Sequence, residues 1–168
     1  MPTPAENSSS PTPIKQTKFS FGATSAIMTN LGLIVGLAAT AQPQVNIIGG
    51  ILVIALADNI SDSLGIHVHQ EAEGLPAREV WISTATNFLT RLFISLSFVG
   101  LIVFLPINAA VICCVVWGAL LLSLMTYAIA RSRGIPPLAG ILEHLGIALL
   151  VIMASKWVSG LVMAKFGK

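Results

Sequence analysis

The sequence predicts an all-α transmembrane protein, a five-helix bundle, and two observations carry that prediction. Of its 168 residues, 55% are hydrophobic and only 10% are charged, whereas a soluble domain carries roughly 25% charged residues. The chain also contains five apolar stretches, each long enough for the roughly 20 residues that a membrane-crossing helix needs. Most of the surface is therefore expected to face lipid.

Polar turns that contain proline, charge or both separate the apolar stretches. Residues 69–79, for example, hold four charges and Pro76, and Pro136-Pro137 stands where the last helix is expected to begin. Residues 1–18 are rich in Pro, Ser and Thr, which predicts a disordered tail before a transmembrane domain at 19–168. The expected spans are 20–41, 45–68, 80–105, 108–130 and 137–164.

Basic residues predict the orientation of the bundle. Five of them fall on the side of the N-terminus: Lys15, Lys18, Arg78, Arg131 and Arg133. The positive-inside rule then places the N-terminus in the cytoplasm and the C-terminus outside. We expect a multi-pass integral membrane protein, in the plasma (inner) membrane if the source is prokaryotic and in a vacuolar or other endomembrane otherwise.

The bilayer is the expected partner, because a formal charge of +2 argues against a nucleic acid. No serine–histidine pair, phosphate loop or H-E-x-x-H motif appears, so we do not expect an enzyme.

Small and polar residues form a stripe on the first predicted helix. Ser25, Thr29, Gly32 and Gly36 follow one another in steps of four, three and four residues, which keeps them on one face. Such a stripe lets two helices approach closely in lipid. The partner helix is either another part of this chain or the first helix of a second copy. Met28, beside Ser25, is the one soft metal ligand nearby.

Acidic and imidazole side chains gather on the second predicted helix. At about 100° per residue, four of them fall within roughly 60° of one another: Asp58, Asp62, His69 and Glu73. His67 and Glu71 form a second i,i+4 pair beside them. An aspartate near the bilayer centre costs roughly 2.5–3.5 kcal/mol, and a divalent cation or a shared proton relieves the repulsion between two of them. The metal-ligand candidates are Asp62, Asp58, His69, Glu73, His67 and Glu71.

A structural interpretation of these residues stands beside the metal-binding one. Counted back from the loop between the second and third helices, Asp58 and Arg91 each lie roughly 16 Å into the membrane, so they are candidates for a buried ion pair. Asp62 has no equally obvious cation, which makes it the stronger functional candidate. The histidines and glutamates are alternatively a solvated helix end.

Three asparagines, in contrast, are of the type that forms interhelical hydrogen bonds. They are Asn30, Asn59 and Asn87.

Two motifs resemble the vacuolar iron transporter family. The stretch from Phe21 to Leu33 looks like the family's F-G-x-x-D-G-x-x-T-x-x-G-L opening, and Ala57-Asp58, Ser61, Leu64-Gly65 and Glu73 look like its A-D-x-x-S-M-x-L-G-E-Y-L stretch ending in S-E. Ser25, Asp62 and Ile66 replace the family's aspartate, methionine and glutamate. The short loop after the second helix also lacks the family's metal-binding insertion.

The resemblance implies a homodimer whose pore lies between the two first helices, exchanging Fe²⁺ or Mn²⁺ for protons. The pore and dimer-seam candidates are Ser25, Met28, Thr29, Gly32 and Gly36. The leading hypothesis is therefore a transporter that exports a divalent cation from the cytoplasm, with no permanently bound cofactor. The alternative is a non-transporting accessory or interaction protein of the same fold.

Overall fold

Five helices make up the computed structural model, which describes residues 13–167, with side chains from residue 22 onward. They are α1 (Pro13–Leu37), α2 (Pro43–Ala72), α3 (Ala77–Phe104), α4 (Ile107–Ser132) and α5 (Pro137–Phe166). The described residues contain no strand, which confirms the all-α prediction. By length and composition, α2 to α5 can each cross a membrane, and the apolar part of α1, Gly22–Leu37, is shorter.

The helices extend beyond the apolar spans that the sequence predicts. α1 begins at Pro13, so residues 13–18 of the predicted tail form its first turns, while residues 1–12 lie outside the described part of the chain. α2 continues to Ala72 and α3 begins at Ala77, so the loop expected at 69–79 is a short turn. Glu, Gln and Ala favour the helix, which lets both helices continue through polar sequence.

The same glycine turn closes α2 and α4. Gly74 and Gly134 have φ of 72° and 67°, a left-handed conformation that favours glycine. After α2, the Gly74 N–H donates to the Glu71 carbonyl and the Leu75 N–H donates to the Gln70 carbonyl, the pattern of a Schellman motif. Gly134 and Ile135 repeat both bonds after α4, and a proline then starts the next helix.

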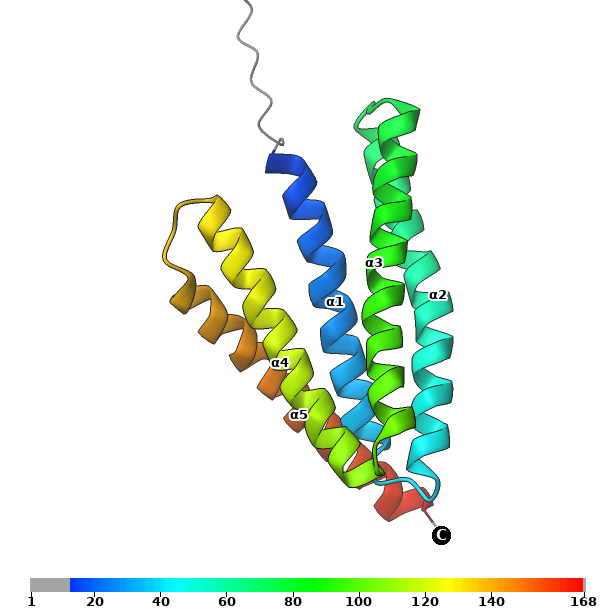
Figure 1. Ribbon diagram of the computed structural model, residues 1–168. Helices are drawn as coiled ribbons and strands as arrows, with labels where there is room; N and C mark the ends of the chain where they lie inside the picture. Colours follow the sequence, from blue (N-terminus) through cyan, green and yellow to red (C-terminus); the bar gives the residue numbers. More distant parts are fainter. Residues whose placement is uncertain (1–12, 168) are drawn as a thin grey trace, which may run out of the picture.

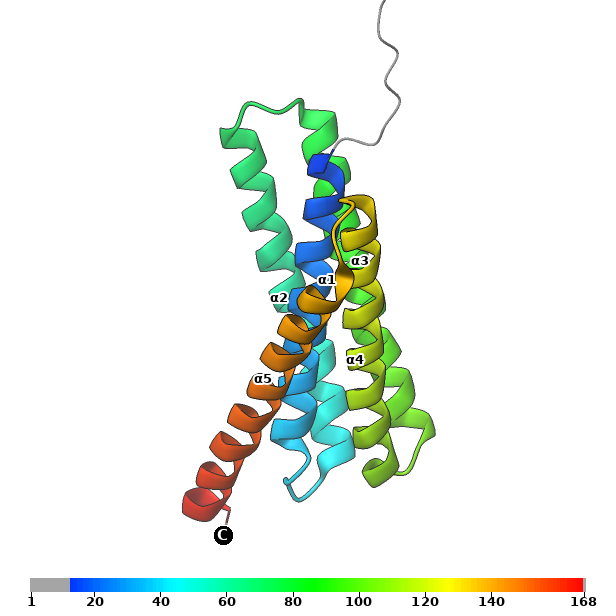
Figure 2. The same cartoon turned by 90° about the vertical axis from the view of Figure 1, so that its left-hand side faces the viewer.

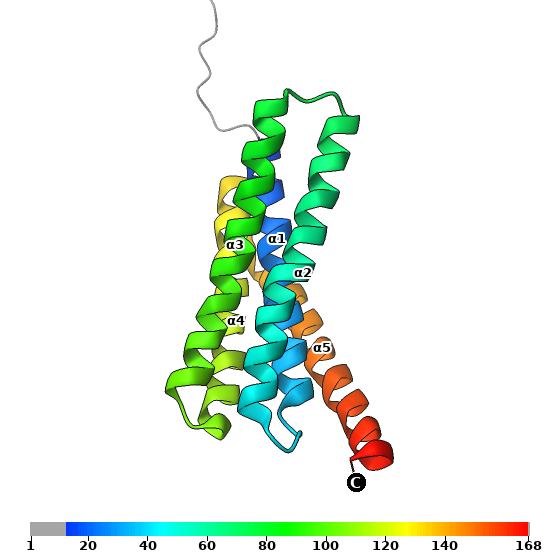
Figure 3. The ribbon, with the colours of Figure 1, turned by 90° about the vertical axis from the view of Figure 1, so that its right-hand side faces the viewer.

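α1 runs through the middle of the bundle, with α2 and α3 on one side of it and α4 and α5 on the other (Figure 1). Its buried side chains, among them Ile27, Leu31 and Ile34, belong to the same apolar core as Phe98 and Ile102 of α3. α5 diverges from the other helices toward the C-terminus (Figures 2 and 3). Ala148 is the one fully buried residue of α5, so most of that helix is left for contact with lipid or protein.

One end of the bundle collects the start of α1, the α2–α3 turn and the α4–α5 turn (Figure 1). The α2–α3 hairpin extends beyond the other helices at this end. The basic residues that predict the orientation therefore all belong to segments at or near this end: Lys15, Lys18, Arg78, Arg131 and Arg133.

Candidate functional site

A buried arginine forms the centre of the interface between α2 and α3. Arg91 is 0% exposed. Its Nε donates to Asn59 Oδ1 at 2.8 Å, and its Nη2 donates to Asp58 Oδ2. Its Nη1 lies 2.5 Å from Asp62 Oδ2, an ion pair without the alignment of a hydrogen bond. One guanidinium thus engages three oxygens from a single turn of α2. We call these four residues, Arg91, Asp58, Asn59 and Asp62, the Arg91 cluster.

Helix geometry places the Arg91 cluster deep in the bundle. Arg91 lies about 15 Å along α3 from Trp81 and about 20 Å from the end of the helix at Phe104. Trp81 is exposed at the hairpin end of α3, and tryptophan is enriched at membrane–water interfaces. The cluster is therefore near the middle of the apolar length of the helix, where an unneutralised charge is most costly.

Formal charges do not cancel within the Arg91 cluster. Asp58 and Asp62 contribute two negative charges against the single positive charge of Arg91, which leaves a net charge of about −1 when both carboxylates are ionised. The side chains of Asp58 and Asp62 are 41% and 34% exposed, whereas Arg91 is enclosed. Both carboxylates are therefore partly exposed on the side that faces away from Arg91, which we call their open edges, and the surplus charge is accessible from outside the bundle.

The ion pairs settle one sequence expectation and correct another. Asp58 pairs with Arg91 as predicted. The expectation that Asp62 has no cation as obvious as that of Asp58 was wrong, because the same guanidinium reaches it. Counting residues from the turn aligned Arg91 with Asp58 alone. The planar fork of an arginine has donors on both sides, however, and can bridge two carboxylates that lie one helical turn apart.

A ladder of polar contacts continues from the Arg91 cluster in both directions. Asn87 Nδ2 donates to Ser63 Oγ at 3.1 Å, and Gln70 Nε2 donates to Ser83 Oγ at 2.8 Å nearer the turn. On the other side, Asn30 Nδ2 donates to Ser95 Oγ at 3.0 Å. The bonds of Asn87 and Asn30, together with the bond from Arg91 to Asn59, confirm the interhelical role predicted for the three asparagines.

The serine and glutamine partners of this ladder were not predicted. A signal for Ser95 was present, since Asn87, Arg91 and Ser95 follow one another at intervals of four residues along α3.

Glycine makes room for the Arg91 cluster on the α1 side. A β-carbon at Gly22 would lie 1.9 Å from Asn87 Oδ1 and 3.6 Å from Arg91 Cδ. Any larger residue would overlap the Asn87 side chain. Gly22 therefore allows α1 to pack directly over the polar face of α3, against the side chains of Asn87 and Arg91.

The other predicted metal ligands are not gathered around the aspartates. His67 Nδ1 lies 3.1 Å from Thr84 Oγ1, and its ring packs edge-on against Trp81. His69 and Glu73 form an i,i+4 pair at 3.4 Å with side chains 74% and 52% exposed, and Glu71 is exposed. Among the described residues, no three His, Cys, Asp or Glu side chains come together as a metal site.

The small-residue stripe of α1 meets α5 of the same chain. A β-carbon at Gly32 would lie 3.0 Å from Ser155 Oγ and 3.1 Å from Val151 Cγ1, and Ser155 is also the nearest neighbour of Gly36. The close approach at Gly32 is thus made within the chain. Ser25 and Thr29 are half-buried, and Met28 packs against the apolar core.

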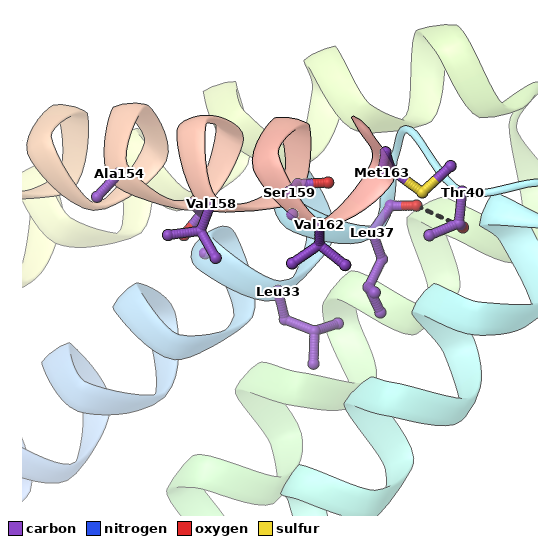
Figure 4. A pocket seen from close by; sticks show the side chains of 11 residues that line it. Leu33, Leu37, Thr40, Ala154, Val158, Ser159, Val162 and Met163 are labelled. Atoms are coloured by element: carbon purple, nitrogen blue, oxygen red, sulfur yellow. Dashed lines mark hydrogen bonds between the residues drawn. The ribbon is translucent and has the colours of Figure 1, made fainter. Parts of the chain in front are cut away.

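Gly32 and Gly36 also line an apolar groove of about 540 Å³ between α1 and α5 (Figure 4). Its walls include Leu33 and Leu37 of α1 and Val158 and Val162 of α5. The hydroxyl of Thr40, at the end of the groove, donates to the Leu37 carbonyl at 2.8 Å.

Comparison of the chain with protein-family models, curated proteins and solved structures finds no match. The geometry of the Arg91 cluster, together with the sequence motifs, is therefore the basis for assigning a function.

Proposed function

We propose that this protein transports a divalent cation, Mn²⁺ or Fe²⁺, across a membrane and that Asp58 and Asp62 bind the ion on its way. The observation that carries the proposal is the surplus negative charge of the Arg91 cluster. Two carboxylates share one guanidinium, and both carboxylates have open outer edges. Charged groups at this depth are costly and mark ion or proton pathways in membrane proteins.

The chemistry of the open edges suits a hard cation. Carboxylate and carbonyl oxygens are the ligands that Mn²⁺ shares with Mg²⁺ and Ca²⁺, and imidazole also suits Fe²⁺. Soft copper sites use thiolate and thioether ligands instead. A proton can neutralise the same surplus charge, so one carboxylate that exchanges a proton for a metal ion would couple the two movements.

The sequence motifs extend the proposal. They resemble the vacuolar iron transporter family, which implies export from the cytoplasm in exchange for protons and a homodimer formed through α1. The basic residues at one end of the bundle support a cytoplasmic N-terminus and an outer C-terminus. The membrane we propose is the plasma (inner) membrane in a prokaryote, or a vacuolar or other endomembrane otherwise.

Transport is tested with the full-length chain purified into liposomes. Entry of Mn²⁺ is followed with a trapped fluorescent indicator, for wild type, Asp62→Asn and Glu79→Gln. Glu79 is an exposed carboxylate on α3 outside the cluster, so its variant is the matched control. We expect Asp62→Asn to lower the initial rate at least about tenfold, because it removes the surplus charge. An unchanged rate in Asp62→Asn excludes the proposed role of Asp62.

A second candidate function, that of a non-transporting protein, is supported by a different observation. Arg91 already neutralises part of the charge on both aspartates, which is the arrangement expected of a non-transporting accessory protein whose polar residues hold its helices together. This candidate function predicts that liposomes containing the wild-type protein take up no more Mn²⁺ than liposomes without protein. It also predicts that Asp62→Asn changes only the thermal stability of the protein.

A further inference from the structure

The three groups that bind the Arg91 guanidinium are all oxygen ligands. They are the carboxylates of Asp58 and Asp62 and the amide oxygen of Asn59. Carboxylate and carbonyl oxygens also make up the coordination shells of hard divalent cations. The guanidinium therefore occupies the position in which these three oxygens would meet a metal ion.

An alternative acceptor for Arg91 lies one turn away on the same helix. Asn87 is buried, and its Oδ1 has no hydrogen-bond partner among the described residues. Asn87 Oδ1 and Arg91 Cδ both lie on the side of Gly22 where a β-carbon would stand in any other residue. The Asn87 amide is oriented with Nδ2 donating to the Ser63 hydroxyl, which leaves Oδ1 as the atom that can accept from Arg91.

We propose that Arg91 is a built-in counter-ion that occupies the cation site of the empty protein and competes with the metal ion for Asp58 and Asp62. When the ion binds, the guanidinium turns toward Asn87 Oδ1, and Asn59 Oδ1 becomes free to ligate the ion. This inference rests on the proposed function, since it concerns the same aspartates. It adds that Arg91 is a positioning residue that lowers the affinity of the site for its ion and reduces the net charge of the empty site from about −2 to about −1.

Two substitutions separate this role from a purely structural one, because they are expected to move the affinity in opposite directions. Arg91→Gln removes the competitor, so Mn²⁺ binds more tightly. Asn87→Leu removes the alternative acceptor, so Arg91 is held on the aspartates and Mn²⁺ binds more weakly. A residue that only supports the fold would weaken binding in both variants.

Matched controls come from the same helices. Ser63→Ala breaks the Asn87–Ser63 hydrogen bond but leaves Asn87 Oδ1 in place. Arg78→Gln removes an exposed arginine of α3 far from the cluster. Both are expected to leave the affinity for Mn²⁺ unchanged, which separates a general loss of helix packing or positive charge from the competition proposed for Arg91.

The measurement is a calorimetric titration of Mn²⁺ into the full-length chain in lipid nanodiscs, with folding checked by circular dichroism. We expect the dissociation constant to fall about tenfold in Arg91→Gln and to rise about tenfold in Asn87→Leu, the size of a typical coupling between sites. If Arg91→Gln does not fold, Arg91→Lys serves instead. Its compact ammonium cannot bridge both carboxylates, so a smaller gain in affinity is expected.

The outcomes for this inference and for the proposed function are distinct. Binding to Arg91→Gln but not to wild type supports the counter-ion and contradicts transport by the wild-type protein. Binding to wild type that is equal or weaker in folded Arg91→Gln and Arg91→Lys overturns the counter-ion and leaves transport standing. Absence of binding in all of these proteins overturns both.

Discussion

The guanidinium of Arg91 meets the carboxylate of Asp62, with Nη1 2.5 Å from Oδ2, while its other terminal nitrogen holds Asp58 one helical turn away. The three charged groups therefore act as one unit between α2 and α3. The effect of changing one of them depends on whether the other two are present, because a buried arginine needs at least one acidic partner.

Removing both acids at once is expected to destabilise the protein far more than removing either. Asp58→Asn/Asp62→Asn leaves the buried guanidinium without a counter-charge, which costs about 3–5 kcal/mol of unfolding free energy. Each single variant keeps one ion pair and loses much less. Denaturant unfolding of the protein in detergent, followed by circular dichroism, measures these differences.

The matched control adds Arg91→Gln to the double variant, which removes the orphaned charge and should recover most of the lost stability. Losses in the two single variants that simply add up to the loss in the double variant would show that Arg91 is not shared between the acids.

Gly22 is expected to tolerate no side chain. A β-carbon there would come 1.9 Å from Asn87 Oδ1, so Gly22→Ala must push Asn87 away and disturb the packing of α1 over Arg91. We expect a loss of about 1–3 kcal/mol, the usual cost of overpacking. Gly65→Ala on α2 is the control, since a β-carbon at Gly65 meets nothing within 4 Å, and alanine generally favours a helix over glycine. Equal melting temperatures for the two variants would contradict the close contact.

Gly74 is expected to be required by its backbone conformation. With φ at 72°, it closes α2 in a left-handed turn that costs an alanine roughly 1–2 kcal/mol. Gly74→Ala should therefore lower the unfolding free energy by that amount, and Gly74→Asn should lower it less, because asparagine visits this conformation more readily. Gly146→Ala within α5, where a β-carbon meets nothing within 4 Å, provides the control. The thermal unfolding midpoints of the three variants give the comparison, and an unchanged midpoint in Gly74→Ala would argue against the turn.

The helices and their order could be predicted from the sequence because their determinants are local. Apolar runs of spanning length define α2 to α5, and prolines at positions 76, 106 and 136 begin new helices wherever the chain turns back. The helix ends were predicted less well near 69–79. Hydropathy marks where the apolar stretch ends, whereas the helix itself continues until Gly74 ends it with a left-handed backbone.

The partners of individual side chains depended on the tertiary structure. The Asp58–Arg91 pair was predictable because antiparallel neighbours can be aligned by counting residues from their turn. The second pair, to Asp62, depends on how far a long side chain reaches and how α2 is rotated about its axis. Likewise, the sequence offered two partners for the Gly32 stripe, and the packing of α5 against α1 decided that Gly32 contacts Ser155. Spacing along a helix determines which residues share a face, but only the packed bundle determines what that face meets.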